Sequence, residues 1–416
     1  MYANLLADSE RLSQMEPRER ALLTALLYGV IERRLTLDYA IGVLASRAAD
    51  SLTPHTRVAL RLGLYQLFYM NIPPHAAVSE TVSLGKSKGE RALINAVLRA
   101  AAAYPEGVPP PPAARSLVRH LSVLHSVPAE TVRYFLSRIG EEETRALLAS
   151  FCTRPPLFLR VNTRKTDRDT YLAVLREAGL SAMPDPLTPH GIRLTDAIPT
   201  ASLPGYAEGL FFVQDAASQL TTEVLSPLGG HRVLDLCACP GGKSFGAAMA
   251  AGDKADVLSR DIHASKLSLI RQGALRLGLS SVRTAEWDAT VPDPALCGKI
   301  DRVICDVPCS GLGVIAKKPD LRYRSLSGLS ELTALSARIL DAAAEALAPR
   351  GVLLFSTCTL TREENEDTVK AFLARHPRLA AEDFSVGSLR SEAGMLTLWP
   401  HRHGTDGFFM AKIRRL

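Results

Sequence analysis

Short apolar runs alternate with helical stretches in the second half of the chain, from about Phe211 onward. This alternation is typical of parallel strands joined by crossover helices. The expected strands cover residues 232–237, 255–261, 282–287, 301–306 and 351–358. We therefore predict an α/β domain with a doubly wound, mostly parallel sheet over residues 206–416.

The first part of the chain shows no strand-like alternation. Apolar residues recur at helical spacing after Pro17, and Thr53 precedes a proline as a helix cap does. A further helix is expected from about Glu90 to Tyr104, so residues 1–104 form a small all-α domain. Residues 105–205 begin with a proline-rich connector, followed by helices near 116–125 and 129–150 and a small α+β piece.

Composition narrows the class of protein. A chain of 416 residues exceeds one ordinary core, and 47% hydrophobic with 22% charged residues argues against general disorder. No apolar run approaches the roughly 18 residues of a membrane span, and the N-terminus does not resemble a secretory signal, so we expect a cytoplasmic protein. Seven cysteines make a disulfide framework improbable, and a net charge of +6 is a weak footprint for nucleic-acid binding unless it is focused locally.

The strongest local motif joins the first expected strand to a helix through a glycine turn. Glycines allow a ligand to approach the backbone, and the helix N-terminus favours a carboxylate or another anion. The candidate cofactor-binding residues of this loop are Cys237, Ala238, Cys239, Pro240, Gly241, Gly242 and Lys243.

Acidic residues end the following strands at Asp261, Asp288 and Asp306. In nucleoside-binding sheets an acid at the end of the second strand binds ribose hydroxyls. Together the acids suit a ligand with an amine, a ribose and an adenine edge, and S-adenosylmethionine has all three. The alternative is a structural turn with incidental carboxylates.

Two cysteines, Cys309 and Cys358, follow the fourth and fifth expected strands, and Asp306 precedes the first of them. Strand ends beside a nucleoside site are where ligands bind, so the pair suggests a thiolate nucleophile. Each cysteine alone is about as well explained as a buried structural thiol. We expect no metal, because Cys237 with Cys239 and Cys305 with Cys309 lack the usual zinc spacing.

A basic cluster follows the first of these cysteines, at Lys317, Lys318, Arg322 and Arg324, with Tyr323 among them. Near an active site this composition suits a phosphate backbone and a stacked base. The alternative is a solvated helix face.

These motifs together resemble those of the RNA (cytosine-5)-methyltransferases of the Nop2/Sun superfamily. The resemblance runs from about Pro156 to the C-terminus and includes residues 158–163 (FLRVNT), 212–218 (FVQDAAS) and 406–411 (DGFFMA). The first of these resembles an RNA-contacting motif, which makes Arg160, Asn162, Arg164 and Lys165 candidate RNA contacts. Residues 89–99 (GERALINAVLR) are similar to the closing helix of a NusB-like RNA-binding domain. The fusion of both parts is typical of superfamily members that act on small-subunit (16S) ribosomal RNA.

The resemblance implies a class I methyltransferase fold with a seven-stranded sheet, preceded by the NusB-like domain and a small RNA-binding subdomain. It implies S-adenosylmethionine as cofactor, 16S ribosomal RNA as partner, and a monomer. By the same resemblance Cys358 attacks cytosine C6, Asp306 binds the N3/N4 edge of the base, Cys309 assists product release, and Lys243 lies near the reacting groups. A transfer-RNA cytosine-5 methyltransferase and a non-catalytic RNA-binding or assembly factor are the alternatives.

The chain departs from the family pattern at few places. Cys239 stands where the family usually has alanine, and Val307 replaces a common alanine. Residues 1–6 resemble the end of the family's first helix, so we expect that helix to be short or missing.

Overall fold

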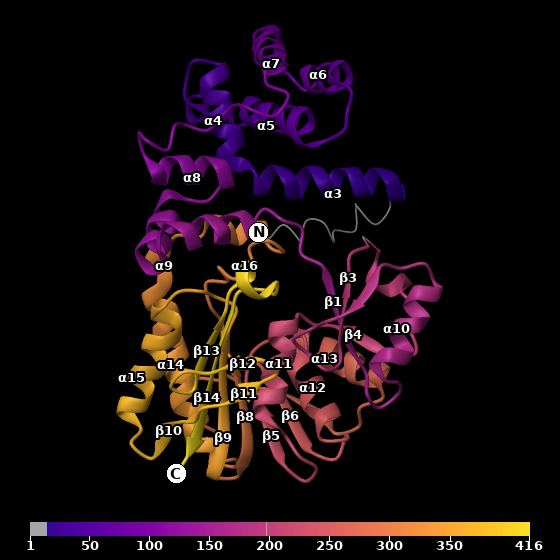
Figure 1. Ribbon diagram of the computed structural model, residues 1–416, viewed down its shortest axis with the longest axis vertical. Coiled ribbons are helices and arrows are strands. Elements are labelled where there is room, and N and C mark those ends of the chain that lie inside the picture. The colour runs from indigo at the N-terminus through magenta and orange to yellow at the C-terminus, as the bar shows by residue number, and fades with distance from the viewer. Residues whose placement is uncertain (1–14, 197) are drawn as a thin grey trace. The chain divides into compact units, whose positions relative to one another are not determined.

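The computed structural model describes residues 15–196 and 198–416 (Figure 1). The chain divides into two compact units. One comprises Met1–Arg154 with Ile315–Leu326, and the other comprises Pro155–Val314 with Ser327–Leu416. Residues 155–205 therefore pack with the α/β part, whereas a short segment after Cys309 leaves it. The prediction of a shortened first helix lies outside the described residues.

The first unit is helical, as predicted. Its helices are α3 (Pro17–Glu32), α4 (Arg34–Leu44), α5 (Pro54–Tyr69), α6 (Pro74–Ser83), α7 (Lys88–Ala101), α8 (Leu117–His125) and α9 (Ala129–Ser150). Leu37, Ile41, Leu60 and Leu98 are fully buried in the core that α4, α5 and α7 share. Thr53 caps α5 by accepting a hydrogen bond from the Thr56 amide, which confirms the capping signal.

A small antiparallel sheet opens the second unit. Its strands β1 (Leu157–Val161), β2 (Ala182–Pro184), β3 (Gly191–Leu194) and β4 (Phe211–Val213) lie in the order β2-β3-β1-β4, with α10 (Arg168–Glu177) beside them. This sheet and α10 correspond to the small α+β piece that the sequence predicted. Strand β4 pairs with β1, so the segment expected to open the α/β domain completes this small sheet instead.

The large sheet has eight strands rather than the expected seven. Its strands are β5 (Arg232–Asp235), β6 (Asp256–Asp261), β7 (Val282–Glu286), β8 (Ile300–Asp306), β9 (Leu347–Thr357), β10 (Leu379–Ala381), β13 (Met395–Leu398) and β14 (Phe408–Arg415). Their order is β10-β14-β9-β8-β5-β6-β7, with β13 paired to β14. The central strands from β9 to β7 are parallel, whereas β10, β13 and β14 pair antiparallel. A hairpin of β11 (Ser385–Val386) and β12 (Leu389–Arg390) stands apart, and the short helix α16 (Pro400–His403) precedes β14.

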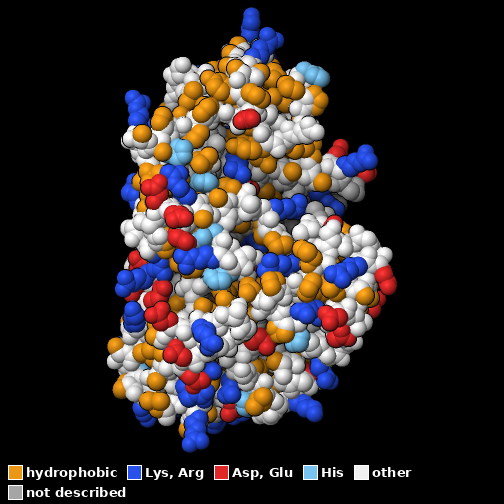
Figure 2. Space-filling view, viewed as in Figure 1, with side chains coloured by type: hydrophobic (Ala, Val, Ile, Leu, Met, Phe, Trp, Pro, Cys, Tyr) orange, Lys and Arg blue, Asp and Glu red, His pale blue; other side chains and the backbone are white. Residues whose placement is uncertain are grey.

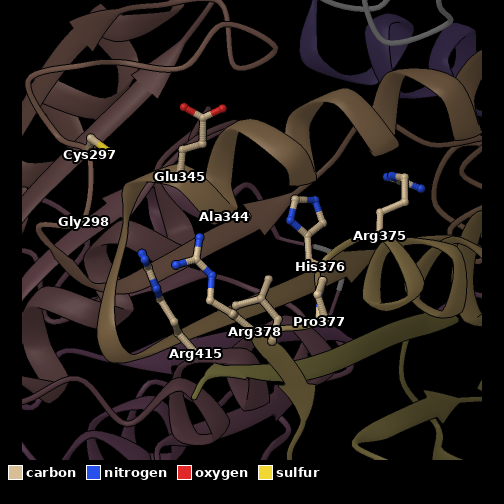
Figure 3. A pocket seen from close by; sticks show the side chains of 10 residues that line it. Cys297, Gly298, Ala344, Glu345, Arg375, His376, Pro377, Arg378 and Arg415 are labelled. Carbon is tan, nitrogen blue, oxygen red and sulfur yellow. The ribbon is translucent and has the colours of Figure 1, made fainter.

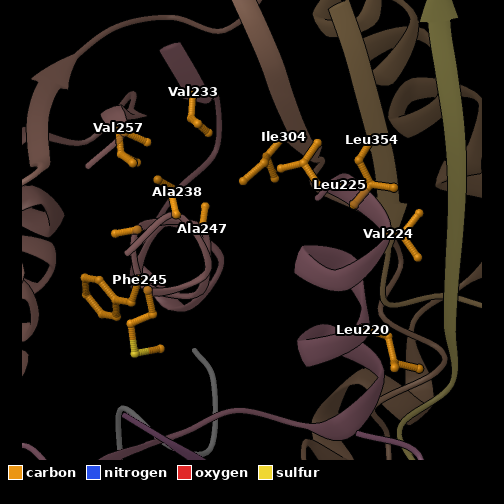
Figure 4. Close-up of a cluster of buried hydrophobic side chains, with 14 of the residues drawn as sticks. Leu220, Val224, Leu225, Val233, Ala238, Phe245, Ala247, Val257, Ile304 and Leu354 are labelled. Carbon is orange, nitrogen blue, oxygen red and sulfur yellow. The ribbon is translucent and has the colours of Figure 1, made fainter. Parts of the chain in front are cut away.

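Helices cover both faces of this sheet. Alternate strand residues point to opposite faces, so Leu353 packs in one core and Leu354 in the other. The face that contains Leu354 is covered by α11 (Ala216–Leu225), α12 (Gly242–Ala250) and α13 (Ala264–Leu277), as Figure 4 shows for the α11 and α12 side chains. The other face is covered by α14 (Leu329–Ala346) and α15 (Thr368–Arg375). The predicted doubly wound architecture is confirmed.

Among the described helices, none has the length and apolar character needed to cross a membrane.

Candidate active site

Every predicted catalytic group follows the carboxyl end of a parallel strand. Strands β5, β8 and β9 are neighbours, so Asp235, Asp306 and Thr357 end at the same edge of the sheet. The loops that follow these strands hold the glycine motif, Cys309 and Cys358. This edge is where open α/β sheets bind their ligands.

The glycine turn between β5 and α12 needs glycine for a steric reason. Gly241 has φ of 110°, and a Cβ there would lie 2.4 Å from the Phe245 ring. The Ala238 amide donates to the Arg260 carbonyl at 2.8 Å, which holds the turn against the end of β6. The helix α12 then begins at Gly242.

A cavity of about 190 Å³ lies beside this turn. Cys237, Asp261 and Asp288 line it, so the structure brings these three predicted residues together. Asp261 is 9% exposed and accepts the His263 amide at 3.0 Å, while Asp288 is exposed. The apolar lining is supplied by Ile262, Ala289, Pro308, Leu335 and Ile339. Acids at the rim with apolar walls suit a nucleoside, and the sequence did not reveal the apolar wall because its residues come from four separate segments.

Asp306 joins the glycine turn to the cysteine loops. Its Oδ2 accepts a hydrogen bond from Lys243 Nζ at 2.6 Å, and its Oδ1 accepts one from Ser356 Oγ at 2.7 Å. The predicted residues Lys243 and Asp306 therefore form an ion pair that is partly shielded from water.

The two predicted cysteines face each other. The Sγ atoms of Cys309 and Cys358 lie 3.3 Å apart, and both side chains are half-buried. The hydrogen bond to Cys358, burial, the charge of Cys358 and, after these, the charge of Glu364 raise the pKa of the Cys309 thiol well above its ordinary value. A thiol that keeps its proton beside a second thiol can donate to the thiolate of that partner.

The remaining cysteines differ from one another. Cys305 is fully buried in the sheet core, and burial raises the pKa of its thiol and of the Cys237 thiol. Cys239 packs against the core beneath α12. Cys297 has an exposed side chain, unlike these three cysteines.

A second cavity, of about 400 Å³, lies at the amino ends of the parallel strands (Figure 3). Its lining includes Arg375, His376, Arg378 and Arg415, with Glu345 opposite. No predicted site residue lies there.

Two of the predicted RNA contacts are buried structural residues. Arg160 is 2% exposed and donates to Thr222 Oγ1 at 2.9 Å and Glu223 Oε1 at 3.3 Å. Burial lowers its pKa to about 10. Asn162 is fully buried and donates to the carbonyls of Gly209 and Leu277 at 2.9 and 2.8 Å. Both side chains connect the small sheet to neighbouring segments of the second unit. The prediction that they contact RNA is therefore wrong.

Arg322 also requires correction. It is 0% exposed, and its guanidinium donates to the carbonyls of His125 and Phe151 at 2.7 and 2.6 Å within the helical unit. Tyr323 next to it donates to the Ile31 carbonyl at 2.6 Å and lies under the Arg34 guanidinium, 3.6 Å from the ring centre. These contacts occupy the groups that were expected to bind phosphate and stack on a base.

Other predicted RNA contacts have exposed side chains, namely Arg164, Lys165, Lys317 and Lys318. Lys165 donates to the Glu208 and Arg276 carbonyls at 2.5 and 3.1 Å, so its ammonium is already engaged. Basic and acidic side chains are mixed over the face in view in Figure 2. Arg164, Lys317 and Lys318 remain predictions.

Comparison with known proteins matches three family descriptions along the chain. Residues 222–414 match the 16S rRNA methyltransferase RsmB/F family, residues 2–103 the NusB family, and residues 131–201 the ferredoxin-like domain of RsmF/B-like methyltransferases. The probable ribosomal RNA small subunit methyltransferase B of Synechocystis sp. is 35% identical over 96% of this chain and 92% of its own. The chain belongs to the RsmB/F methyltransferase family. The Bacillus subtilis relative, again a probable ribosomal RNA small subunit methyltransferase B, is 32% identical over 100% of this chain and 95% of its own.

Solved structures show the same fold. The crystal structure of PH0851 has a TM-score of 0.81 at 24% identity and covers 97% of this chain and 91% of its own. NSun6 from Pyrococcus horikoshii, solved with SFG, has a TM-score of 0.63 at 24% identity and covers 70% of this chain and 99% of its own. The RsmB/F chain described here is thus an S-adenosylmethionine-dependent methyltransferase, and the cavity beside the glycine turn fits that cofactor by its acids and apolar walls.

Asp261→Ala tests the cofactor assignment. We expect the mutant to bind S-adenosylmethionine about tenfold or more weakly, because a buried acid that binds ribose hydroxyls contributes one to three kcal/mol. Titration calorimetry measures the affinity. Asp256→Ala, at the opposite end of β6 and paired with Arg283, is the matched control. Unchanged affinity in Asp261→Ala would reject the ribose contact.

The buried carboxyl of Asp235 should make the free energy of unfolding depend on pH. It is 1% exposed, its Oδ2 accepts from Ser244 at 2.7 Å, and burial raises its pKa from 3.8 to about 7. The native state therefore holds a proton between pH 4 and 7 that the unfolded chain has released, so stability falls as pH rises through this window. We expect Asp235→Asn to be more stable than the wild type by on the order of 2–4 kcal/mol at pH 8, with the difference shrinking toward pH 4. Urea unfolding at both pH values measures it, and a difference that does not change with pH would contradict this account.

Proposed function

We propose that this methyltransferase transfers a methyl group to C5 of a specific cytosine in 16S ribosomal RNA through a covalent adduct between Cys358 and cytosine C6. The observation that carries the proposal is the pair of thiols 3.3 Å apart at the ends of adjacent strands, with Cys309 three residues after Asp306 of the Lys243–Asp306 ion pair. A single cysteine would be compatible with packing. Two facing thiols together with the partly buried carboxylate of Asp306 suit covalent catalysis on a nucleobase.

The chemistry requires a nucleophile because C5 of cytosine is itself unreactive. Attack of the Cys358 thiolate forms a bond from Sγ to C6 and pushes the C5=C6 electron pair toward N3, which takes up a proton. C5 then has the electron density to accept a methyl group. The direction of the Cys309 pKa shift favours a protonated Cys309, and this supports Cys358 as the attacking sulfur.

In the proposed reaction Asp306 binds the polar edge of the base. Lys243 and Ser356 each donate one hydrogen bond to its carboxylate, and this fixes its orientation. A carboxylate held in this way accepts from the N4 amine and stabilises the proton on N3.

Cys309 has its role after the methyl group has been transferred. In the proposed release step Cys309, 3.3 Å from Cys358, gives its proton to the departing Cys358 sulfur, and the resulting Cys309 thiolate accepts the C5 proton. The electron pair left at C5 re-forms the C5=C6 bond as the bond from C6 to Cys358 Sγ breaks, and the proton on N3 returns to solvent. Proton transfer by a positioned side chain accelerates such steps by about 10²–10⁴-fold.

S-adenosylmethionine supplies the methyl group when bound. Asp261 and Asp288 would hold its nucleoside part in the cavity, with Cys237 and the glycine turn closing one side. Pro308 lines the same cavity and directly precedes Cys309, so the cofactor cavity and the thiol pair share one loop.

The proposed partner is a structured ribosomal RNA whose target base leaves its stack to enter the site. Exposed Arg164, Lys317 and Lys318 are the proposed backbone contacts. The relatives' names support the small-subunit substrate. We further propose that the protein acts as a cytoplasmic monomer.

The decisive experiment incubates the protein with labelled S-adenosylmethionine and total RNA from a strain that lacks it, then maps methylated cytosines. The proposal expects label at one cytosine of 16S RNA, as 5-methylcytosine. Label in transfer RNA would favour the transfer-RNA enzyme. Absence of label in folded protein that binds the cofactor would favour a non-catalytic RNA-binding factor.

A further inference from the structure

A buried acid and a buried amide follow the second cysteine loop. Glu364 is 2% exposed and Asn365 is 0% exposed, and both lie in the π-helical turn η5 (Glu363–Asp367). Such turns are rare and are found mostly where a helix has been adapted to a functional site. Neither residue was singled out from the sequence, because a π-helical turn has no recognisable periodicity.

Glu364 connects the two cysteine loops through one carboxylate. Its Oε1 accepts the Ser310 amide at 2.7 Å, and its Oε2 accepts the Ser310 hydroxyl and the Thr361 hydroxyl, each at 2.6 Å. The Ser310 and Thr359 hydroxyls also lie 2.6 Å apart. Ser310 directly follows Cys309 and Thr359 directly follows Cys358, so the network fixes the chain beside both sulfurs.

Asn365 secures the second loop alone. Its Oδ1 accepts the Thr357 hydroxyl at 2.6 Å, and its Nδ2 donates to the Thr359 carbonyl at 3.0 Å. These two threonines flank Cys358. The strand end that presents Cys358 is therefore held on both sides by a fully buried amide.

The donors to Glu364 are neutral. In the described part of the chain no Lys or Arg forms an ion pair with it, and the bonds come from one amide and two hydroxyls. Burial of a carboxylate without a cation is costly and makes its field strong at short range. A nearby negative charge disfavours the thiolate, so it stabilises the protonated form of a thiol. Cys309 directly precedes Ser310, which is hydrogen-bonded to Glu364.

Other charged groups among the described residues already have partners. Lys243 and Asp306 form an ion pair with each other. On the far side of η5, Glu363 and Asp367 line a separate cavity against α14, and Asp367 pairs with Arg362. Glu364 is thus a buried acid that forms no ion pair with a cation of the described residues, and its hydrogen bonds reach the loop that holds Cys309.

We propose that Glu364 is a positioning residue that sets the spacing of the two thiols and keeps the shared proton on Cys309, so that the negative charge of the pair resides on Cys358. This proposal rests on the proposed function, in which Cys358 is the nucleophile. The proposal explains why two cysteine side chains have different roles, with Cys358 as the nucleophile and Cys309 as the protonated thiol. Ionisation of the pair releases one proton to solvent, and the remaining proton stays on Cys309 until the release step.

Thiol alkylation tests this assignment without RNA or cofactor. The full-length protein is treated with iodoacetamide between pH 5 and 10, and the rate at each cysteine is read by peptide mass spectrometry. In the wild type, Cys358 is expected to react at lower pH than Cys309. In Glu364→Gln, which keeps size and hydrogen-bonding capacity but removes the charge, the Cys309 midpoint is expected to fall by about one pH unit, a tenfold gain in thiolate at a given pH.

Two variants serve as controls. Glu363→Gln makes the same change at the adjacent, exposed position and is expected to leave both midpoints unchanged. Ser310→Ala removes a hydroxyl bond but keeps the charge, so the Cys309 midpoint is expected to stay within about 0.3 units of the wild type. A Ser310→Ala shift as large as that of Glu364→Gln would overturn the electrostatic part of the proposal.

The proposal is also overturned if Cys309 alkylates at lower pH than Cys358 in the wild type, or if folded Glu364→Gln keeps the wild-type Cys309 profile. Near-UV circular dichroism and S-adenosylmethionine binding establish folding. If Glu364→Gln does not fold, the wild-type order and Ser310→Ala decide. Failure of the proposed function would appear separately, as absence of cytosine methylation by wild-type protein whose thiols follow the expected order.

Discussion

Cys358→Ala is expected to abolish methyl transfer to RNA, with a loss of about 10⁴-fold or more. The reason is that the alanine mutant cannot form the bond to C6, so C5 never acquires the electron density needed to accept a methyl group. The mutant should still bind S-adenosylmethionine, because Cys358 is not among the residues lining the cofactor cavity. Incorporation of labelled methyl into 16S RNA, measured beside calorimetry of cofactor binding, separates the two effects.

The matched control for this prediction is Cys297→Ala. Cys297 is exposed and lies at the amino ends of the parallel strands, at the opposite edge from the thiol pair. Its loss should leave methylation at the wild-type level. Activity retained by Cys358→Ala would show that another group attacks the base or that no adduct is formed.

Cys309→Ser should stop the reaction after the methyl group has been transferred. A hydroxyl ionises far less readily than a thiol, so the mutant loses the group that assists elimination while Cys358 remains able to attack. The expected result is a covalent protein–RNA adduct that survives denaturing gel electrophoresis, with turnover reduced by about 10²-fold or more. The adduct should be lost when the RNA lacks the target cytosine.

Cys358→Ser provides the opposite arm of this experiment. The two sulfurs are 3.3 Å apart, so both substitutions perturb the same small volume and differ mainly in which role is removed. No adduct is expected from Cys358→Ser. If it traps the RNA and Cys309→Ser does not, then the two cysteines have exchanged roles.

Sequence patterns predicted the secondary structure of the α/β part well. The five expected strands appear as β5 to β9 with shifts of a few residues, because buried parallel strands bounded by turns leave a clear signal. Strands β2, β4 and β10 to β13 were missed. They are short or lie at the edges of sheets, where few residues carry the pattern.

The candidate site was predictable where chemistry and strand ends coincide. Lys243, Asp306, Cys309 and Cys358 were chosen from separate motifs, and the structure gathers them at one edge. Parallel topology accounts for this, since it brings the carboxyl ends of successive strands together whatever the connecting helices contain.

The RNA contacts were predicted less well, for an identifiable reason. The residue type of an arginine or an asparagine does not reveal whether its side chain faces solvent or donates to backbone carbonyls. Arg160 and Asn162 lie on the small sheet and are buried against α11 and α13, and Arg322 is buried within the helical unit. Only long-range packing distinguishes such structural cations and amides from ligands for phosphate.

The sequence by itself determined the fold class, the cofactor loop and the identity of the two cysteines, because periodicity, glycine turns and motif order are local properties. The tertiary structure decided which groups touch. It paired Lys243 with Asp306 and formed the cavity proposed for the cofactor. It also brought Glu364 into contact with Ser310, which follows Cys309 and is 54 residues away in the chain. Hydrogen bonds and electric fields act over a few ångströms in space, so neither can be read from residues distant in sequence until the chain has folded.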